Sequence, residues 1–281
     1  MTKNGKTIQI FLPDGDPKHI KKATITTGQI EVIQIPRNLL VDTPALLTSL
    51  LNFNGIYILV DTLSAIKPEI YIGKGLVKNR IYQHKNKKDF WTTLFAIRKQ
   101  STDFDDAQNR YLEYYFIKEA LTQNRAIMHE NKQLPICHKV SEAMEADLEC
   151  YVEMIKTLLS TLGLKCFEPL ESVTPSQRFI CRDKYGNWGQ CSITNEGYLL
   201  YKGAICKLDL HKGSSRFPIR DELINKGILI ENNGHYVLQE NYQFSSPSTA
   251  AFIVLGRNAN GRTEWKNKEG KTLADLDTIK K

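Results

Sequence analysis

Several side chains that could act on a phosphate ester lie between positions 57 and 113 of the 281-residue sequence. Hydrolysis of a phosphodiester builds negative charge on the phosphate oxygens and on the leaving alkoxide, and it needs a group that accepts a proton from water. Arginine, lysine or a metal ion can balance the charge, and histidine, tyrosine or a carboxylate can take part in the proton transfer. The candidate residues are Tyr57, Tyr71, Lys74, Arg80, His84 and Glu113.

Arg80 and His84 are four positions apart in a basic segment that we predict to be helical after Gly75. Residues four apart share one face of a helix, so a permanent cation lies beside an imidazole that titrates near neutral pH. Arg80 suits the phosphate oxygens, and His84 suits a place beside the attacking water. The simpler alternative is that His84 is one more polar residue on a basic helix face.

Glu113 falls on the apolar side of a helix that we predict over residues 106–123, with Asp105 and Gln108 forming a capping box at its start. At about 100° per residue, Glu113 lies within an apolar stripe made of Leu112, Phe116, Ile117 and Ala120. Burying a lone carboxylate is unfavourable, so it must be neutralised, paired or bound to a cation. Two interpretations stay open: a hard divalent ion such as Mg²⁺, or a buried ion pair with Arg110.

Tyr57 and Tyr71 lie in two short apolar runs that predict a hairpin. A phenol with a pKa near about 10 accepts protons poorly at neutral pH unless nearby cations favour the phenolate. Lys74, Arg80 and a metal ion are cations of that kind. The residues alone do not choose between the tyrosines, and an isolated strand tyrosine is ordinarily a packing residue.

Residues 54–126 resemble the GIY-YIG nuclease family. The motifs that carry the resemblance are, in order, Gly55-Ile56-Tyr57, Tyr71-Ile72-Gly73-Lys74-Gly75, Arg80, His84, Glu113 and Asn124. The loop between the two tripeptides has 13 residues, somewhat more than is usual for the family. The resemblance implies a nuclease domain over residues 54–130, with a small antiparallel sheet flanked by helices.

The same resemblance implies how the substrate and a metal would be held. Glu113 would bind Mg²⁺ or Mn²⁺, and Lys74 and Arg80 would bind the scissile phosphate. Asn124 matches a family asparagine on the substrate side, although it could equally be a helix-end residue.

The resemblance also implies how the proton would move. Tyr57 is the favoured base, and Tyr71 would position the water. His84 matches a position where some members have a histidine near the attacking water.

Three further segments surround this domain. Residues 1–43 predict a β-rich N-terminal extension, and residues 136–171 predict a helical connector whose apolar spacing runs from 141 to 162. Residues 172–281 predict a separate C-terminal α+β domain, and the fold class of the whole chain is predicted to be α+β.

Residues 244–273 resemble an uncharacterised domain that commonly follows GIY-YIG nucleases in bacterial proteins. Ser246 before Pro247 predicts the start of a helix, and Gly256 predicts its end. The loop that follows contains Arg257, Asn258, Asn260 and Arg262. Either these side chains read DNA bases, with Arg257 and Asn260 as the candidate substrate-binding residues, or they fold the domain's own hairpin.

Charge favours a polyanionic partner. The formal net charge is +7, and residues 74–100 alone hold eight basic residues and one acid. Such a patch suits DNA, because each neutralised phosphate releases condensed counterions. The alternative is a solvated, lysine-rich face.

The sequence has no run of about 18 apolar residues, and its first residues lack the apolar core of a signal peptide. Six cysteines without a C-x₂-C pair predict reduced, structural thiols rather than a zinc or redox centre. We therefore expect a cytoplasmic protein that does not enter a membrane, and a homodimer stays open.

Together these features predict a divalent-metal-dependent DNA endonuclease, and the habits of the family suggest restriction or phage defence. One alternative is a non-catalytic DNA-binding module that keeps the fold. Another is a nuclease that acts on single-stranded DNA or RNA.

Overall fold

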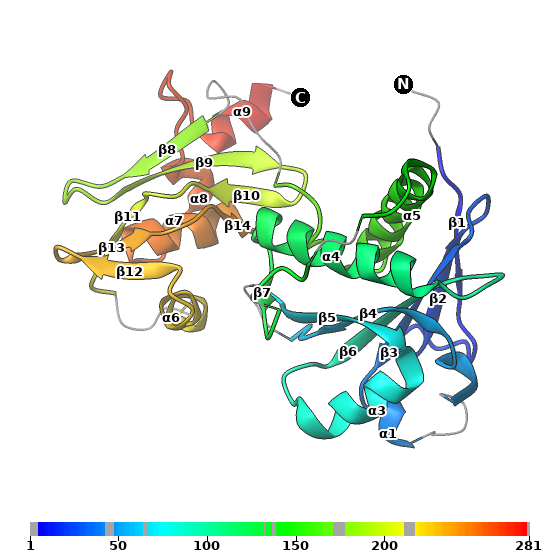
Figure 1. Cartoon of the computed structure of the whole chain (residues 1–281). Coiled ribbons are helices and arrows are strands. Elements are labelled where there is room, and N and C mark those ends of the chain that lie inside the picture. Colours follow the sequence, from blue (N-terminus) through cyan, green and yellow to red (C-terminus); the bar gives the residue numbers. More distant parts are fainter. Residues whose placement is uncertain are drawn as a thin grey trace. The chain divides into compact units, whose positions relative to one another are not determined.

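The computed structural model describes residues 5–42, 48–63, 67–131, 133–136, 139–170, 178–210 and 217–279. The chain divides into two compact units, residues 1–169 and 170–281, which we call the N-terminal and C-terminal units (Figure 1). The extension, the nuclease domain and nearly all of the connector expected from the sequence fall within the first of these units. Cys137, one of the six cysteines, lies outside the described residues.

The N-terminal unit is built on a seven-stranded sheet in the order β1-β2-β3-β6-β4-β5-β7. Neighbouring strands are antiparallel except β5 and β7, which run parallel. The strands are β1 (Ile8–Phe11), β2 (Lys21–Ile25), β3 (Ile30–Pro36), β4 (Asn54–Val60), β5 (Glu69–Leu76), β6 (Thr93–Lys99) and β7 (Ile127–Met128). The helices are α1 (Leu39–Asp42), α3 (Val77–Lys87), α4 (Asp106–Gln123) and α5 (Glu142–Thr161).

The α+β class is confirmed, but the sheet is larger than the small sheet expected from the sequence. Its extra strands come from the N-terminal segment, which is continuous with the sheet. Strand β3 pairs with β6 from Ile30 opposite Lys99 to Pro36 opposite Thr93. Strand β2, which we did not predict, lies between β1 and β3. The N-terminal segment thus contributes buried β3 side chains to the core.

Helices cover both faces of this sheet (Figure 1). Successive residues of a strand point to opposite faces. Ile56 and Ile58 of β4 join the core that contains side chains of α4 and α5. Tyr57 and Leu59 join the core that contains Ile81 of α3. The tyrosine of the first tripeptide therefore faces α3.

Helix α4 has the bounds that the sequence predicts, residues 106 to 123. The Asp105 side chain accepts from the Gln108 backbone N–H at 2.8 Å, and the Gln108 side chain accepts from the Asp105 backbone N–H at 3.2 Å. This predicted capping box is confirmed, and it satisfies two N–H groups that the first turn cannot pair. Asn124 ends the helix in the left-handed conformation, with a φ of 50°.

Helix α5 packs on the sheet and does not run free as a connector. Ser141, where the expected helical spacing begins, caps its start. The buried side chains of α5 belong to the same core as β4 and β5, and they are Leu148, Val152, Ile155, Leu158 and Leu159. The predicted amphipathic stripe exists, and it covers the sheet of the N-terminal unit.

The C-terminal unit holds a second seven-stranded sheet in the order β12-β13-β11-β9-β10-β14, with β8 paired to β9. The strands are β8 (Arg178–Arg182), β9 (Trp188–Thr194), β10 (Gly197–Leu200), β11 (Ile205–Lys207), β12 (Leu229–Asn232), β13 (His235–Leu238) and β14 (Tyr242–Phe244). The helices are α6 (Phe217–Asn225), α7 (Pro247–Leu255), α8 (Gly261–Glu264) and α9 (Leu273–Ile279).

Helix α7 forms the buried centre of the C-terminal unit. Ser246 caps it, Pro247 occupies its first turn, and Gly256 ends it with a φ of 63°, all as the sequence predicts. Every residue from Ala250 to Leu255 is buried. No helix in the described ranges is long and apolar enough to cross a membrane.

The packing of α5 gives a stability prediction. We expect Ile155→Ala to lower the free energy of unfolding by about 2–5 kcal/mol, because it leaves a cavity against the sheet. Glu149→Ala, on the exposed side of the same helix, is the matched control and should change it by about 0.5 kcal/mol or less. Urea unfolding followed by circular dichroism measures both. Equal stabilities of the two variants would contradict the packing of α5 on this core.

Candidate active site

The candidate residues gather at an outer edge of the N-terminal sheet. Strand β7 pairs with β5 only at Glu69 and Ile70. In the described part of the chain, residues 71–76 therefore have β4 on one side and no strand on the other. Helix α3 packs near β5 from one face of the sheet and α4 from the other. Side chains from both faces can meet around this edge.

Tyr57, Tyr71 and His84 form a cluster on the α3 face. The Tyr57 hydroxyl oxygen lies 2.8 Å from Nε2 of His84. The His84 ring centre lies 5.0 Å from that of Tyr71 and 5.6 Å from that of Tyr57, and the two phenol rings are 6.2 Å apart. The three residues that the sequence singles out for proton transfer are thus in mutual contact.

The motif glycines are explained by close packing. A Cβ on Gly73 would overlap the phenol of Tyr57, its cross-strand neighbour. A Cβ on Gly55 would overlap the carbonyl oxygen of Ile97 in β6. Gly75 has a φ of 115°, which residues with a side chain rarely adopt. The packing of β4, β5 and β6 therefore explains why positions 55 and 73 are glycines.

Glu113 is a partly buried carboxylate that faces a lysine. Its Oε2 lies 3.9 Å from Nζ of Lys74, and 19% of its side chain is exposed. Burial raises the pKa of this carboxyl, and the charges of Lys74, Arg80 and Arg110 oppose the rise. Arg110 also donates to Asp106 at 2.7 Å. The predicted position of Glu113 in the apolar stripe holds, and its charge is only partly compensated.

Burial governs the protonation of the aromatic cluster. It raises the pKa of both Tyr57 and Tyr71, and Arg80 offsets this only in part. Burial therefore outweighs the cation that would favour the phenolate. Burial also lowers the pKa of His84 to about 4, and the Lys88 charge adds to the effect. At neutral pH the cluster therefore holds neutral phenols and a neutral imidazole.

Lys88 and Glu130 belong to the same cluster, and the sequence analysis missed them. The Lys88 Nζ lies 4.4 Å from the centre of the Tyr71 ring and forms an ion pair with Glu130. Only 7% of Lys88 is exposed. No signal in the sequence separates it from Lys87, because burial of Lys88 depends on how the chain leaves α3.

A histidine and carboxylate pair extends the cluster along β5. His129 Nδ1 lies 2.5 Å from Oε1 of Glu69, and His129 Nε2 lies 3.8 Å from Oε1 of Glu130. The Phe90 ring stacks on the His129 ring at 4.0 Å. Glu69 and His129 are 60 positions apart, so only the parallel pairing of β5 and β7 reveals the contact.

Asn124 occupies the end of α4, where its backbone N–H donates to the Ala120 carbonyl. It follows Glu113 by eleven positions. Because an α-helix rises about 1.5 Å per residue, about 16 Å of helix axis separates the two. Of the two interpretations left open for Asn124, this geometry favours the helix-end residue.

Arg257 and Asn260 lie in the C-terminal unit and make contacts within their own loop. Arg257 Nη2 is 2.7 Å from Oε1 of Glu264. The Asn260 side chain accepts from the Arg262 backbone N–H at 3.1 Å and caps α8. These contacts favour the interpretation in which the loop folds its own domain.

The donors at the β5 edge fit one hard divalent cation that keeps most of its water. Within the described ranges, no three His, Cys, Asp or Glu side chains are grouped to hold a metal, so Glu113 would be the single carboxylate ligand. Mg²⁺ usually retains several waters and takes phosphate oxygens as further ligands. The desolvated charge of Glu113, with Lys74 at 3.9 Å, suits such an ion.

Comparison with known proteins finds a match in the C-terminal unit. Residues 179–277 match the family model described as a domain of unknown function, DUF4357. This range contains the residues 244–273 in which we noted the resemblance to an uncharacterised domain. No curated protein and no solved structure matches the chain.

The contact between Gly73 and Tyr57 can be tested by a double-mutant cycle. We expect Gly73→Ala to lower the free energy of unfolding by about 1–3 kcal/mol, the usual cost of overpacking. In a Tyr57→Ala background the cost should fall, because the phenol that the new methyl group would meet is gone. Urea unfolding of the four proteins gives the coupling energy. The same cost in both backgrounds would show that the contact does not constrain position 73.

The role of Lys88 predicts a shift in the titration of His84. The groups that face His84 are Tyr57, Tyr71, Lys88, Glu130, Arg80 and Lys87. Lys88→Met removes a cation and the lysine that pairs with Glu130, and both changes should move the His84 pKa upward from about 4 toward the ordinary 6.5.

NMR titration of the His84 ring measures this shift directly. Lys88→Arg keeps the charge and should keep the midpoint near the wild-type value. Because the folded-state pKa is depressed, protonation of His84 reduces stability as the pH falls from about 6.5 to about 4, and this loss should be smaller in Lys88→Met. An unchanged midpoint in Lys88→Met would rule out the electrostatic role.

Proposed function

We propose that this protein is a divalent-metal-dependent DNA endonuclease that hydrolyses phosphodiester bonds. The observation that carries the proposal is the 2.8 Å contact between Tyr57 and His84, and the partly buried carboxylate of Glu113 lies 3.9 Å from Lys74 of β5. Together with the basic residues at the β5 edge, these groups meet each need of phosphodiester hydrolysis. The resemblance to GIY-YIG nucleases supports the same activity.

The phosphate would bind between Arg80 and Lys74. The Arg80 side chain belongs to an exposed residue of α3, and a guanidinium can donate two parallel hydrogen bonds to phosphate oxygens. Lys74 lies 3.9 Å from Glu113, so its ammonium group can turn from the carboxylate to an incoming phosphate. Together they would hold the charge that builds on the equatorial oxygens.

The proton of the attacking water would pass through Tyr57 to His84. A free Tyr57 phenolate is disfavoured, because burial raises the pKa of this phenol. The hydroxyl can instead take a proton from water while its own proton moves to Nε2 of His84, 2.8 Å away. Bound phosphate adds negative charge nearby and favours the imidazolium that results. Tyr71, in ring contact with His84, would position the water.

Glu113 would hold the divalent ion, Mg²⁺ or Mn²⁺, which when bound supplies positive charge at the phosphate and the leaving oxygen. The chain's own contribution is to keep this carboxylate in place. It lies on α4, whose capping box and buried stripe fix the helix against the sheet.

The C-terminal unit would select the DNA target, and restriction or phage defence in the cytoplasm is the setting that the resemblance suggests. The alternatives are a DNA-binding module without activity and a nuclease acting on single-stranded DNA or RNA. The hydrogen-bonded Tyr57 and His84 favour a catalyst, because binding phosphate alone requires no proton acceptor.

Nicking of supercoiled plasmid tests the proposal. We expect activity with Mg²⁺ or Mn²⁺, none with a chelator, and a loss of about 100-fold or more in Glu113→Gln, as for removal of one electrostatic stabiliser. Glu119→Gln is a close control, because Glu119 is also on α4, is 19% exposed and lies 3.9 Å from Lys156.

Equal activity of the two glutamine variants would reject Glu113 as the metal ligand. DNA binding without nicking under any metal would favour the non-catalytic module. Parallel digests of duplex DNA, single-stranded DNA and RNA identify the substrate class.

A further inference from the structure

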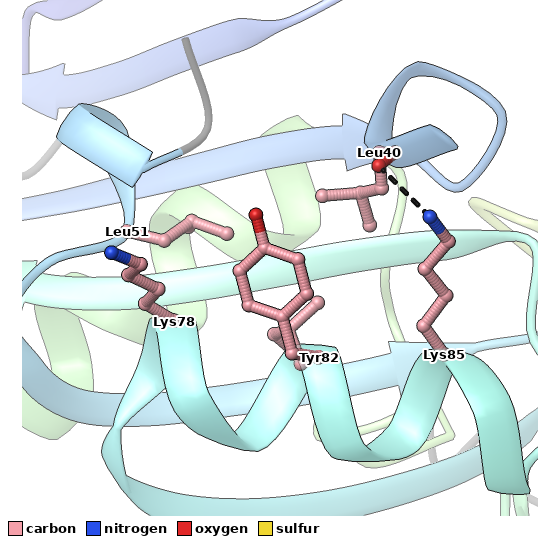
Figure 2. Close-up of a pocket in the computed structure, with 6 residues that line it drawn as sticks. Leu40, Leu51, Lys78, Tyr82 and Lys85 are labelled. Carbon is pink, nitrogen blue, oxygen red and sulfur yellow. Dashed lines mark hydrogen bonds between the residues drawn. The ribbon is translucent and has the colours of Figure 1, made fainter. Parts of the chain in front are cut away.

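A hollow lies on the flank of α3 that carries Tyr82 (Figure 2), and at about 100° per residue His84 lies about 160° away from Tyr82 around the helix axis. It has room for about one water molecule and is partly open to solvent. Its lining consists of Leu40, Leu51, Lys78, Ile81, Tyr82 and Lys85. None of these side chains belongs to the candidate active site, so the hollow is a separate feature of the N-terminal unit.

The hollow combines an apolar floor with an aromatic ring and two cations. Leu40 and Leu51 are buried, whereas 43% of Tyr82 is exposed. The Tyr82 ring stands between the side chains of Lys78 and Lys85 (Figure 2). Lys85 Nζ donates to the Leu40 carbonyl at 3.3 Å, and among the described residues this leaves two of its three donors for a ligand. No acidic residue occurs in α3.

The spacing of the two lysines suits a nucleic-acid strand. Lys78 and Lys85 are seven positions apart, about 10 Å along a helix that rises 1.5 Å per residue. Three base steps at about 3.4 Å each cover the same length. Tyr82 is four positions after Lys78 and three before Lys85, so the phenol shares their side of α3. Arg80 lies about 160° away from Tyr82 around the helix axis.

We propose that the surface of α3 at this hollow binds an unpaired nucleotide of the DNA substrate, with the base stacked on Tyr82 and phosphates about three steps apart along the same strand on Lys78 and Lys85. The inference deepens the proposed function, because it names a substrate with a single-stranded segment. Sites for single strands combine basic grooves with aromatic rings on which bases stack. A paired base keeps its faces within the duplex stack and cannot offer one to Tyr82.

The two flanks of α3 would then hold two parts of one substrate. Arg80 on the catalytic flank would hold the scissile phosphate, and Lys78, Tyr82 and Lys85 on the other flank would hold a strand that has left the duplex. Because both flanks belong to one helix that is anchored by buried Val77 and Ile81, their separation is fixed.

Fluorescence anisotropy with a labelled single-stranded DNA, and with the duplex of the same sequence, tests this site. The measurements use the full chain with a chelator present, so that no cleavage occurs. We expect Tyr82→Ala to weaken single-strand binding about fivefold or more, the lower end of the loss on removing a stacking aromatic, and to leave duplex binding unchanged. Tyr82→Phe keeps the ring and should bind as the wild type does.

The lysines are tested by the salt dependence of single-strand binding. Lys78→Gln and Lys85→Gln should each reduce the slope of log K against log salt by about 0.7, the value for one phosphate contact on a single strand. Lys118→Gln is the charge-matched control, because its ammonium lies 5.9 Å from the Tyr114 ring on α4, in a similar lysine and tyrosine pair. It should leave the slope as in the wild type.

Wild-type binding by Tyr82→Ala would overturn the site, and so would an equal loss on single strand and duplex. Thermal melting checks that each variant is folded, and if Tyr82→Ala is not, the two lysine variants decide the question. Tyr82-dependent binding by a protein that nicks nothing would keep this site and reject the nuclease. If the protein nicks DNA but Tyr82→Ala binds single strands as the wild type does, the nuclease proposal stands and this site is rejected.

Discussion

The hydroxyl of Tyr57 can reach His84 because position 73 has no side chain. The phenol lies where a Cβ on Gly73 would be, and this placement brings its oxygen to 2.8 Å from Nε2 of His84. Tyr57 is on β4, Gly73 is on β5 and His84 is on α3. The contact therefore depends on the register of the two strands and on how α3 packs on the sheet. A shift of β4 by one residue would turn Tyr57 to the opposite face, and a shift of β5 by one residue would move Gly73 away from the phenol.

The large sheet explains how so precise a contact can form at an edge. Beyond Ile70, residues of β5 have a strand neighbour on one side only within the described ranges, and an isolated edge would be mobile. Strands β3 and β6 extend the sheet on the other side of β4, and α5 covers one of its faces. The N-terminal segment and α5 therefore stiffen the sheet against which α3 and α4 hold the candidate side chains.

Features that depend on neighbouring residues could be predicted from the sequence, and features that depend on distant pairing could not. The bounds of α4, its capping box and the start and end of α7 follow from local hydrogen bonding and backbone preference. The membership of β1, β2 and β3 in the central sheet depends on pairing between Ile30 and Lys99. The Lys88 and Glu130 pair was missed for the same reason, since its partners are 42 positions apart.

Burial reverses the electrostatic expectation at the centre of the site. Nearby cations alone would lower the Tyr57 pKa, but a buried phenol loses more hydration on ionising than Arg80 restores. The same loss keeps His84 neutral and leaves Glu113 with incomplete compensation. The protonation of such a site responds strongly to a bound ion. A cation bound at Glu113 would stabilise the ionised carboxylate, and a phosphate near Arg80 would favour protonation of His84. Substrate and metal would thus supply the charges that stabilise the ionised groups of this buried site. The proton of the attacking water would move to His84 only when both are bound.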